Sequence, residues 1–522
     1  MIKNFIGMVF LLLMAIACQR TNKNDISFVD QKIDGEIDRI VNALPEITFP
    51  DRTINLIEYA GFEPDSEGTK DFQPVLNKAI KELAAKGGGT IYFPHTWGSR
   101  KWVKGTDVYR MDGPINLASN IRLMLAHGTK IQFTFNPVNY LDNGKGVITR
   151  WEGVSIKSFS PLIRAFNAEN VAIVGEGKGA MPIIDGDGEK WQHWSTTQDP
   201  QLDHKYVLHR LSDEDVKLTD REFVDVNKDF YRPYLLEFYL CKNILIDGVQ
   251  LFNTPFWTVH PVFSENVTVR NVIFNVQAEN SDGVDPESTH NVLIERCVFN
   301  NHDDNVAIKS GRNKEGREGI DISGTEIEKI NSPFIHGNKM FGATENVVVR
   351  NCIMKGHHAI CIGSEVAGSV RNVYAVDNVG VQDVKYGLFI KSSPKRGGMV
   401  ENIYVRNMKL HKASMAVVLN PCYAKQDTVS THYPLFRNIY VKDMEVDYAE
   451  NGGVEILGWS KLPIKGVHLE NVTIKELNPK KRANPVKVIN ATQINFKNVQ
   501  IEGEKFNGDY SDESGEKPRS RT

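Results

Sequence analysis

The chain has 522 residues, of which 41% are hydrophobic and 24% charged, and its formal net charge at pH 7 is −3. These values are ordinary for a soluble globular protein and allow one large domain or several small ones. The nearly balanced charge lacks the strong basic excess of nucleic-acid-binding proteins, so we expect no nucleic-acid partner.

The first 18 residues have the pattern of a signal peptide that ends in a lipid-attachment cysteine. Lys3 precedes an apolar stretch, residues 5–16, that is too short for an ordinary transmembrane helix. The stretch leads into Ala15-Ile16-Ala17-Cys18, which resembles the lipobox at which a cysteine is lipidated after cleavage. We therefore expect an exported protein in the periplasm or at the outer membrane, anchored only through lipid on Cys18. An ordinary signal peptide that happens to contain a cysteine is the alternative.

Two helices are predicted before the first strand. Residues 19–50 start polar and then place apolar residues on one helical face, which predicts a tether followed by an N-terminal capping helix. Residues 71–85 show the same helical spacing, and Gly87-Gly88-Gly89 end this second helix before a strand at residues 90–94. A phosphate-binding loop is the alternative for the three glycines, but such a loop precedes its helix.

An internal repeat dominates the rest of the chain and determines the predicted fold. Its template is a small polar residue, a short alternating Val/Ile strand and a turn residue near the sixth position, as in residues 266–274, 291–299 and 346–354. Several copies begin 23 to 30 residues apart. Strands this short cannot bury a face alone, whereas stacked copies can. Further copies begin at Asn120, Asn170, Asn243, Asn372, Asn402, Asn438, Gly466 and Gln493.

The repeat predicts an all-β protein, a right-handed parallel β-helix, over residues 51–505. Such a solenoid stacks valine on valine inside and asparagine on asparagine at a turn, where the amides form ladders. A β-propeller is the alternative, but its blades are longer than most of these spacings. Cys297 and Cys352 both fall at an inward position and are expected to stack in the core. The tail, residues 506–522, is polar, and we expect disorder after about residue 503.

Carboxylates gather at one turn of the repeat. Asp282 lies within residues 280–285, and Asp303-Asp304 follow the next repeat start; Asp282 and Asp304 are 22 residues apart, about one coil. One coil rises about 5 Å, so the three carboxylates should be neighbours, and their repulsion should raise some of their pKa values. A glycosidase needs one acid that is protonated for the leaving oxygen and one ionised carboxylate to activate water. A set of acidic turns or a calcium site is the alternative.

Strand alternation predicts which other side chains share this face. The valine and isoleucine of residues 306–308 point inward by pattern, which turns Asp303 and Lys309 outward. The aligned stretches of the next two coils turn His357, Phe389 and Lys391 the same way. Two consecutive residues of a regular strand cannot both face outward, so a bend before residue 305 is needed if both adjacent aspartates act.

These stretches resemble glycoside hydrolase family 28, the polygalacturonase family. The family pattern is Asn-Thr-Asp, Gly-Asp-Asp, Gly-His-Gly and Arg-Ile-Lys, in that order. This sequence reads Asn280-Ser281-Asp282, His302-Asp303-Asp304, Gly356-His357-His358 and Phe389-Ile390-Lys391. The similarity covers roughly residues 55–500 and includes residues 149–153, 160–163 and 257–261. Each triplet alone is a weak signal, but the ordered combination is specific.

The resemblance implies an inverting hydrolase of α-galacturonide bonds in polygalacturonan or rhamnogalacturonan oligosaccharides, with no metal and no other cofactor. By this resemblance, Asp303 is the general acid, and Asp282 and Asp304 position and deprotonate the attacking water. His357 tunes the acid, and Lys391 binds a sugar carboxylate. An acid and a base that face each other across a water fit the inverting geometry.

Three departures from the family pattern bear on the substrate. Phe389 stands where the family has an arginine, and a phenyl ring cannot replace the carboxylate-binding fork but can stack on an apolar sugar face, which makes rhamnose a candidate beside the leaving group. His358 replaces a glycine and should narrow the cleft. The insertion between Lys309 and Asn346 is large enough to wall one end of the cleft, which favours exo action. The expected substrate contacts are Lys391, Phe389, Lys309, Asn280 and His358.

Two other functions remain open from the sequence. A pectate lyase on the same fold would need calcium-binding carboxylates and a cationic base, and it would release unsaturated products. A non-catalytic β-helix would bind glycan without turning it over. The partner expected in each case is a pectic polysaccharide or oligosaccharide, and we expect the protein to be a monomer.

Overall fold

The computed structural model describes residues 28–96, 107–177, 179–196, 200–423, 431–481 and 485–515. The chain divides into two compact units, Met1–Ala43 and Leu44–Thr522. The first unit contains helix α2 (Phe28–Ala43), which confirms the amphipathic helix predicted there. Cys18 and the rest of the predicted signal peptide lie outside the described residues. Within the described ranges, no helix is both long and apolar enough to cross a membrane.

The second unit opens with two helices beside its first strands. Strand β1 (Thr53–Asn55) leads into α3 (Leu56–Ala60), and α4 (Gln73–Ala85) follows with one buried face. Gly87 and Gly88 have φ angles of 91° and 103°, a left-handed region that suits glycine and ends the helix. Strand β2 (Gly89–Phe93) comes next, so the predicted helix and strand are both confirmed.

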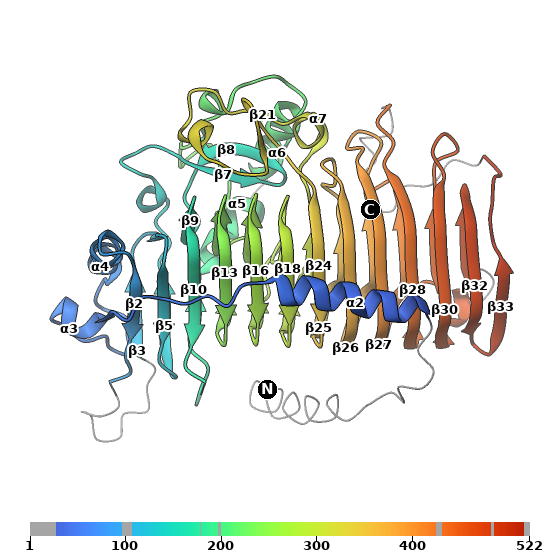
Figure 1. The fold of residues 1–522 in the computed structure, drawn as a ribbon, viewed down its shortest axis with the longest axis horizontal. Coiled ribbons are helices and arrows are strands. Elements are labelled where there is room, and N and C mark those ends of the chain that lie inside the picture. The colour runs from blue at the N-terminus through green and yellow to red at the C-terminus, as the bar shows by residue number, and fades with distance from the viewer. Residues whose placement is uncertain are drawn as a thin grey trace. The chain divides into compact units, whose positions relative to one another are not determined.

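Most of the second unit is built of successive coils, and the strands of these coils form stacks of parallel strands, one of which Figure 1 shows. Each strand hydrogen-bonds to the strand of the coil before it and of the coil after it, with valine and isoleucine in register. The strands of this first stack, after β1 and β2, are β5 (Ile121–Leu125), β10 (Glu169–Gly175), β13 (Lys242–Asp247), β16 (Glu265–Arg270), β18 (His290–Glu295), β24 (Thr344–Arg350) and the first parts of β26 (Val370–Lys391), β27 (Met399–Asn420), β28 (Leu435–Ala449), β30 (Ile464–Leu477) and β32 (Ala491–Ile501). These five long strands continue into the second stack, and β26 and β27 also into the third.

An asparagine ladder runs along this stack, as the repeat predicted. Each side-chain amide donates to the amide oxygen of the asparagine one coil earlier, at 2.8 to 3.2 Å. The ladder residues have φ angles of 54° to 61°, a left-handed turn conformation that asparagine tolerates better than most residues. The ladder consists of Asn120, Asn170, Asn243, Asn266, Asn291, Asn346, Asn372, Asn402 and Asn438.

Two further stacks complete each coil. The second contains β3 (Asp107–Met111), β6 (Thr129–Phe133), β11 (Ile183–Asp185), β14 (Gln250–Phe252), β17 (Ile273–Val276), β19 (Val298–Asn301) and the first part of β25 (Ile353–Ile362). The third contains β4 (Ile115–Leu117), β9 (Ile163–Phe166), β12 (Leu236–Tyr239), β15 (Val259–Val262), β20 (Val306–Ile308), β29 (Val454–Leu457) and β31 (Val486–Ile489). One continuous apolar core fills the coils and includes Cys297 and Cys352 on adjacent coils, as predicted. The fold is therefore a parallel β-helix.

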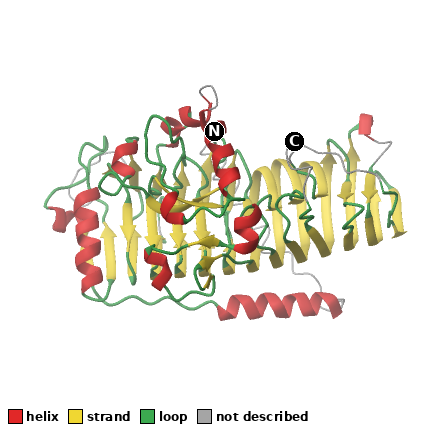
Figure 2. Ribbon diagram, turned by 90° about the horizontal axis from the view of Figure 1, so that it is seen from above, coloured by secondary structure: helices red, strands yellow, loops and turns green. Residues whose placement is uncertain are grey.

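Helices and long loops cover the half of this stack nearer its N-terminal end, while strands dominate the other half (Figure 2). The covering elements include the antiparallel hairpin of β7 (Val147–Trp151) and β8 (Val154–Ser158), with α5 (His193–Thr196) and α6 (Pro200–Leu211). The insertion predicted between residues 309 and 346 adds α7 (Asn313–Glu318) and the short strands β21 (Ile320–Asp321), β22 (Ile335–His336) and β23 (Lys339–Met340). In Figure 1 the hairpin, α6, α7 and β21 lie together above the strands.

The start of the C-terminal tail differs from the sequence prediction. Residues 504–509 form strand β33 (Glu504–Asp509), which pairs antiparallel with β32 and is not disordered as expected. The exposed edge of the last coil offers unpaired backbone groups, and these can order a polar segment that has no core of its own. Phe506 and Tyr510 also pack against the end of the core. The polar composition of the tail did not predict strand β33, because the strand edge that orders it exists only after the coils have stacked.

Candidate active site

The aspartates predicted as catalytic lie at one turn of the β-helix, between the second and third strand stacks. Asp282 follows β17, and Asp303-Asp304 lie between β19 and β20 on the next coil. The backbone N–H of Gly283 donates to the carbonyl of Asp304 at 2.9 Å, and that of Asn305 donates to the carbonyl of His358 at 2.9 Å. Three successive coils are thus hydrogen-bonded at this turn, as the spacing of 22 residues predicted.

The chain bends at residues 302 and 303, before the inward-facing strand β20. The bend lets both adjacent aspartates take part in one cluster, as the alternation argument required. A carboxylate oxygen of Asp303, one of Asp304 and a ring nitrogen of His357 all lie within 4.8 Å of one another. The side chain of Asp303 is 26% exposed, whereas that of Asp304 is 2% exposed. Asp303 is therefore the carboxyl of this pair that is accessible from solvent.

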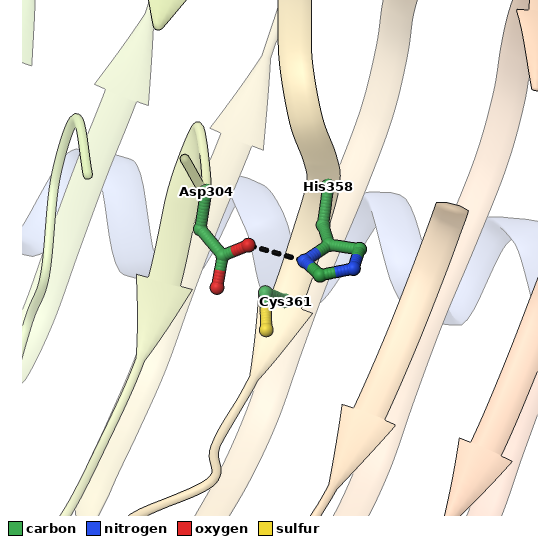
Figure 3. Close-up of side chains that lie close together, drawn as sticks. All are labelled: Asp304, His358 and Cys361. Atoms are coloured by element: carbon green, nitrogen blue, oxygen red, sulfur yellow. Dashed lines mark hydrogen bonds and ion pairs between the residues drawn. The ribbon is translucent and has the colours of Figure 1, made fainter. Parts of the chain in front are cut away.

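Asp304 is held between two nitrogen donors. His358 Nδ1 bonds to one carboxylate oxygen, as Figure 3 shows, and Lys391 Nζ lies 3.1 Å from the other. Burial by itself raises the pKa of Asp304, but Lys391 and His358 together hold the pKa well below its usual range. Burial also lowers the pKa of His358 to about 4, so its ring is neutral near pH 7 and donates one N–H. Asp304 is consequently an ionised and firmly oriented carboxylate.

Within the described part of the chain, the one side chain that hydrogen-bonds to Asp303 is that of His357. His357 Nδ1 lies 3.3 Å from its carboxylate, and the His357 side chain is 39% exposed. Burial raises the pKa of Asp303, but the hydrogen bond from His357 together with the charges of Lys391 and His357 outweighs burial and leaves the pKa below its ordinary value. The predicted pairing of His357 with Asp303 is therefore present, and in the free site it favours the ionised acid.

Asp282 carries the strongest tendency to hold a proton. Burial raises the pKa of Asp282 well above its usual range, and the charges of Asp285 and Asp303 raise it further. Burial likewise raises the pKa of Asp285, to about 7. Lys309 Nζ lies 3.6 Å from Asp282 and 3.4 Å from Asp285, which offsets part of this repulsion. The predicted separation of pKa values among the aspartates is present, with Asp282 and Asp304 at opposite extremes.

Two predicted substrate contacts are placed differently from expectation. Lys309 is only 3% exposed, because its ammonium is the buried counter-ion of the Asp282–Asp285 pair and lies over the Trp257 ring. Phe389 is only 3% exposed, because it packs with Tyr386 and its neighbours in an apolar cluster outside the coil interior. Alternation correctly turned both side chains out of the coil. It could not show that neighbouring coils and loops would then cover them.

Two other predicted substrate contacts, Asn280 and Lys391, are bound to side chains of the protein itself. The side-chain oxygen of Asn280 accepts from Arg232 at 2.7 Å, which leaves the amide N–H group of Asn280 as its donor. Lys391 is nearly buried beside the rings of Phe389 and Tyr423, and its ammonium is bound to Asp304. A substrate carboxylate at Lys391 would therefore share this ammonium with the catalytic carboxylate.

Among the residues that the structure describes, two groups of side chains have the composition of a metal site. Asp304, His358 and Cys361 form one group (Figure 3), and Asp303, Asp304 and His357 form the other. Both depend on Asp304, whose oxygens already bind His358 and the ammonium of Lys391, and that ammonium would repel a cation. Burial also raises the pKa of the Cys361 thiol well above its usual range, which disfavours the thiolate that a metal needs. The chemistry of these donors therefore fits a hydrogen-bonded carboxylate better than a metal centre.

Sequence reasoning missed Asp285, Glu365 and Lys385. Asp285 was visible in the Asp-Gly-Val-Asp stretch, and its register with Asp282 was the available signal. Glu365 Oε2 lies 3.9 Å from Lys309 Nζ, and Glu365 also pairs with Arg312 at 2.6 Å, which no local motif indicates. Lys385 lies one residue before the stretch that aligns with the catalytic coils. Glu365 and Lys385 come near the catalytic turn only because the coils stack, so no local sequence pattern points to them.

A network of buried ion pairs joins the site to the covering elements. Arg312 of the insertion pairs with Glu365 and, at 3.2 Å, with Glu152 beside the β7–β8 hairpin. Arg150 of that hairpin binds Glu287 at 2.5 Å and Glu315 of α7 at 3.2 Å. All the charged groups of this network are nearly or completely buried. The insertion and the hairpin therefore form one rigid wall beside the catalytic turn.

The chain is similar to known proteins along most of its length. The model of glycosyl hydrolases family 28 matches residues 224–493, more than half of the chain. A probable polygalacturonase of Vitis vinifera is 26% identical over 452 residues, which cover 84% of this chain and 77% of that protein. An endo-polygalacturonase of Pectobacterium parmentieri is 25% identical over 391 residues, 71% of this chain and 81% of that protein. The crystal structure of a hyperthermoactive exopolygalacturonase from Thermotoga maritima matches with a TM-score of 0.74 and 29% identity, covering 91% and 97% of the two chains.

Proposed function

The chain belongs to glycosyl hydrolases family 28, and we propose that it hydrolyses α-galacturonide bonds of pectic polysaccharide from the end of the glycan chain. The observation that carries the proposal is the meeting of Asp282, Asp303 and Asp304 with His357 at one turn, in the order of the family pattern. The polygalacturonase names of the similar proteins support the substrate class. The exopolygalacturonase name of the Thermotoga maritima protein supports action at the chain end.

The reaction is an inverting hydrolysis in one displacement. Asp303 gives its proton to the glycosidic oxygen as the bond from that oxygen to the anomeric carbon breaks. A water held by Asp282 and Asp304 attacks the same carbon from the opposite face and gives its proton to a carboxylate of this pair. Inversion follows because the acid and the base act on opposite faces of the sugar. The ionised state of Asp304 suits a base, and the exposure of Asp303 suits the group that meets the leaving oxygen.

Asp303 takes up its proton from solvent when the substrate binds, because binding raises its pKa. In the free site His357 and Lys391 together keep the pKa of Asp303 below its ordinary value despite burial. A sugar that covers the exposed side of Asp303 removes water from it, and a galacturonate carboxylate adds a second negative charge nearby. Both effects raise the pKa of a carboxyl group. After Asp303 has given its proton to the leaving oxygen it is ionised, and His357 stabilises this charged state until Asp303 takes up a proton from solvent for the next turnover.

Lys391 binds the substrate carboxylate. The protein has no arginine side chain for the sugar beside the leaving group, because Phe389 replaces the arginine of the family pattern. Phe389 packs in an apolar cluster next to Lys391 and His358, so this position offers no charge to a second sugar carboxylate. Either polygalacturonan or the galacturonate–rhamnose backbone of rhamnogalacturonan presents a carboxylate to Lys391. The two backbones differ in the sugar on the leaving side, where rhamnose has no charge to bind.

Exo action follows from the wall beside the site. The buried pairs of Arg312 and Arg150 fix the insertion and the hairpin against the catalytic turn, which supports a cleft that is closed on that side. A closed cleft admits the end of a glycan and excludes its middle. The released product is then a saturated monogalacturonate.

The protein works outside the cytoplasm as a lipid-anchored monomer. Family 28 enzymes act on extracellular pectin, which fits export, and the lipobox-like Ala15-Ile16-Ala17-Cys18 supports a lipid anchor at the outer membrane or in the periplasm. Incorporation of labelled palmitate into the wild-type protein, and its loss in Cys18→Ser, tests the anchor. Equal label in the two proteins would rule out Cys18 as the attachment site.

The function is tested with the soluble protein that lacks residues 1–18. It is incubated with oligogalacturonides and with rhamnogalacturonan oligosaccharides in the presence of a chelator, beside an Asp303→Asn control. Mass spectrometry should detect saturated monogalacturonate, which should disappear in the control. Unsaturated products that need calcium would identify a lyase, and binding without product would identify a non-catalytic glycan-binding protein.

A further inference from the structure

A hollow of about 410 Å³ continues from the catalytic turn towards the C-terminal coils. His357 forms its near end, and the next coils contribute residues from the same column of turns. Its lining is polar and carries charges of both signs. The lining residues are His302, Gly356, His357, Asp383, Val384, Lys385, Lys412, Ala413, Ser414 and Glu450.

Lys385 is the cation of this hollow that remains available to a ligand. Lys412 Nζ is bound to Asp383 at 2.6 Å, and the charge of Glu450 acts on Lys412 as well. Among the described residues, no carboxylate forms an ion pair with Lys385, whose ammonium lies 5.7 Å from the centroid of the Tyr386 ring. The two acidic residues of the hollow are therefore directed to Lys412, and Lys385 keeps its positive charge for a ligand.

Lys385 also lies within electrostatic range of the catalytic groups. Burial lowers its pKa first, the charge of Lys391 lowers it further, and the charges of Asp304 and Asp303 raise it. Lys385 and Lys391 both belong to strand β26, so the same coil places two ammonium groups around the adjacent aspartates. Phe389, on this strand, stands where the family pattern has an arginine.

We propose that Lys385 and its hollow form a binding subsite for the carboxylate of a hexuronate residue of the substrate, next to the residue held by Lys391. Lys385 would bind a sugar carboxylate, as an arginine at position 389 would, but it does so from another position on strand β26. The lysine ammonium lies at the end of a flexible side chain and binds a carboxylate as a single charge, so this subsite does not need the planar guanidinium of an arginine. This inference rests on the proposed function and names a substrate contact within it.

The matched set of variants is Lys385→Gln, Lys385→Arg and Lys409→Gln. Lys409 lies on the neighbouring strand β27, pairs with Glu445 at 3.1 Å and does not line the hollow, so it controls for the loss of any surface cation. Initial rates are measured on trigalacturonate, and the Kd of trigalacturonate is measured by calorimetry in an Asp303→Asn background. Thermal unfolding midpoints confirm that each variant is folded.

We expect Lys385→Gln to raise KM and Kd about tenfold, as the loss of one hydrogen bond to a charged group does, with kcat changed less than threefold. Lys385→Arg should keep both constants within threefold, and Lys409→Gln should leave them unchanged. The KM of the wild type should rise more steeply with NaCl than that of Lys385→Gln, because salt screens the lost charge pair. Equal effects of Lys385→Gln and Lys409→Gln would overturn the subsite.

Failure of the function and failure of the subsite give different results. If the wild type cleaves none of the oligosaccharides, the proposed hydrolysis falls, while the ratio of Kd values between Lys385→Gln and its parent still decides the subsite. If the wild type cleaves trigalacturonate and the Lys385→Gln constants are unchanged, the hydrolase stands and the subsite is wrong.

Discussion

The pH dependence of turnover should depend on Asp285, a buried carboxyl outside the family triplets. Lys309 Nζ lies 3.6 Å from an oxygen of Asp282 and 3.4 Å from an oxygen of Asp285, so Lys309 bridges the two carboxyl groups. The proposed mechanism needs Asp282 ionised so that it can hold and activate water. The charge of Asp285 opposes that ionisation and raises the pKa of Asp282. Asp285→Asn removes the charge and keeps the volume of the side chain.

The size of the effect follows from the bridge. The two carboxylate oxygens are at most about 7 Å apart, and two unit charges at that distance interact by about 2.4 kcal/mol at an effective dielectric constant of about 20. That energy corresponds to about 1.7 pKa units. Lys309 would also turn more of its charge towards Asp282, which changes the pKa in the same direction. The pKa that governs the acidic limb of the profile should therefore fall by at least about one unit in Asp285→Asn.

The assay is kcat/KM against pH, because this ratio reports ionisations of the free enzyme. Asp282 and Asp285 titrate as a pair, so the limb of the wild type describes the pair, and the limb of the variant describes Asp282 alone. Asp443→Asn, which removes an exposed carboxylate at a distant turn, is the control and should leave the limb in place. An acidic limb that stays unmoved in Asp285→Asn, or moves to higher pH, would refute the reasoning.

Three further predictions concern the donors, the wall and metal ions. His358→Gly should lower kcat at the optimal pH about tenfold, because Asp304 loses a hydrogen bond that orients its charged carboxylate, while the acidic limb, which Asp282 governs, should stay in place; an unchanged kcat would contradict this role. Glu287→Ala should lower the free energy of unfolding by about 3–5 kcal/mol, measured as a lower urea midpoint at unchanged m value, because it leaves Arg150 and His260 with fewer buried partners. A midpoint like that of the wild type would mean that water replaces the lost pair. A chelator should leave kcat/KM unchanged for the hydrolase, and a loss restored by calcium would point to the lyase.

The network around Glu287 explains why the wall can carry charge so far from water. His260 lies 3.1 Å from Glu287 and 3.4 Å from Glu237, and the two carboxylates raise the pKa of His260 despite its burial. A raised pKa stabilises the folded state below the ordinary pKa of histidine, and this contribution is lost as the pH rises through the pKa of the folded state. The wall should therefore be most stable in mildly acidic solution.

The sequence by itself determined the coil and the column of turns that carries the carboxylates. Periodic asparagines and alternating valines encode both the hydrogen-bonded ladder and the inward face, because each depends only on local backbone geometry repeated along the chain. The same alternation placed Asp282, Asp303 and His357 on one turn, and it required the bend that the structure contains.

Tertiary structure alone decided which of the outward side chains meet solvent. Lys309 and Phe389 leave the coil as predicted, but Trp257 lies under the first and Tyr386 packs against the second, so both are buried. The carboxylate partners of Lys309 come from two different coils, and Arg150 of the wall pairs with Glu287 and Glu315, each more than 100 positions away. Exposure and pKa depend on such distant neighbours, because desolvation and Coulomb energies are set by distance in space and leave no local pattern in the sequence.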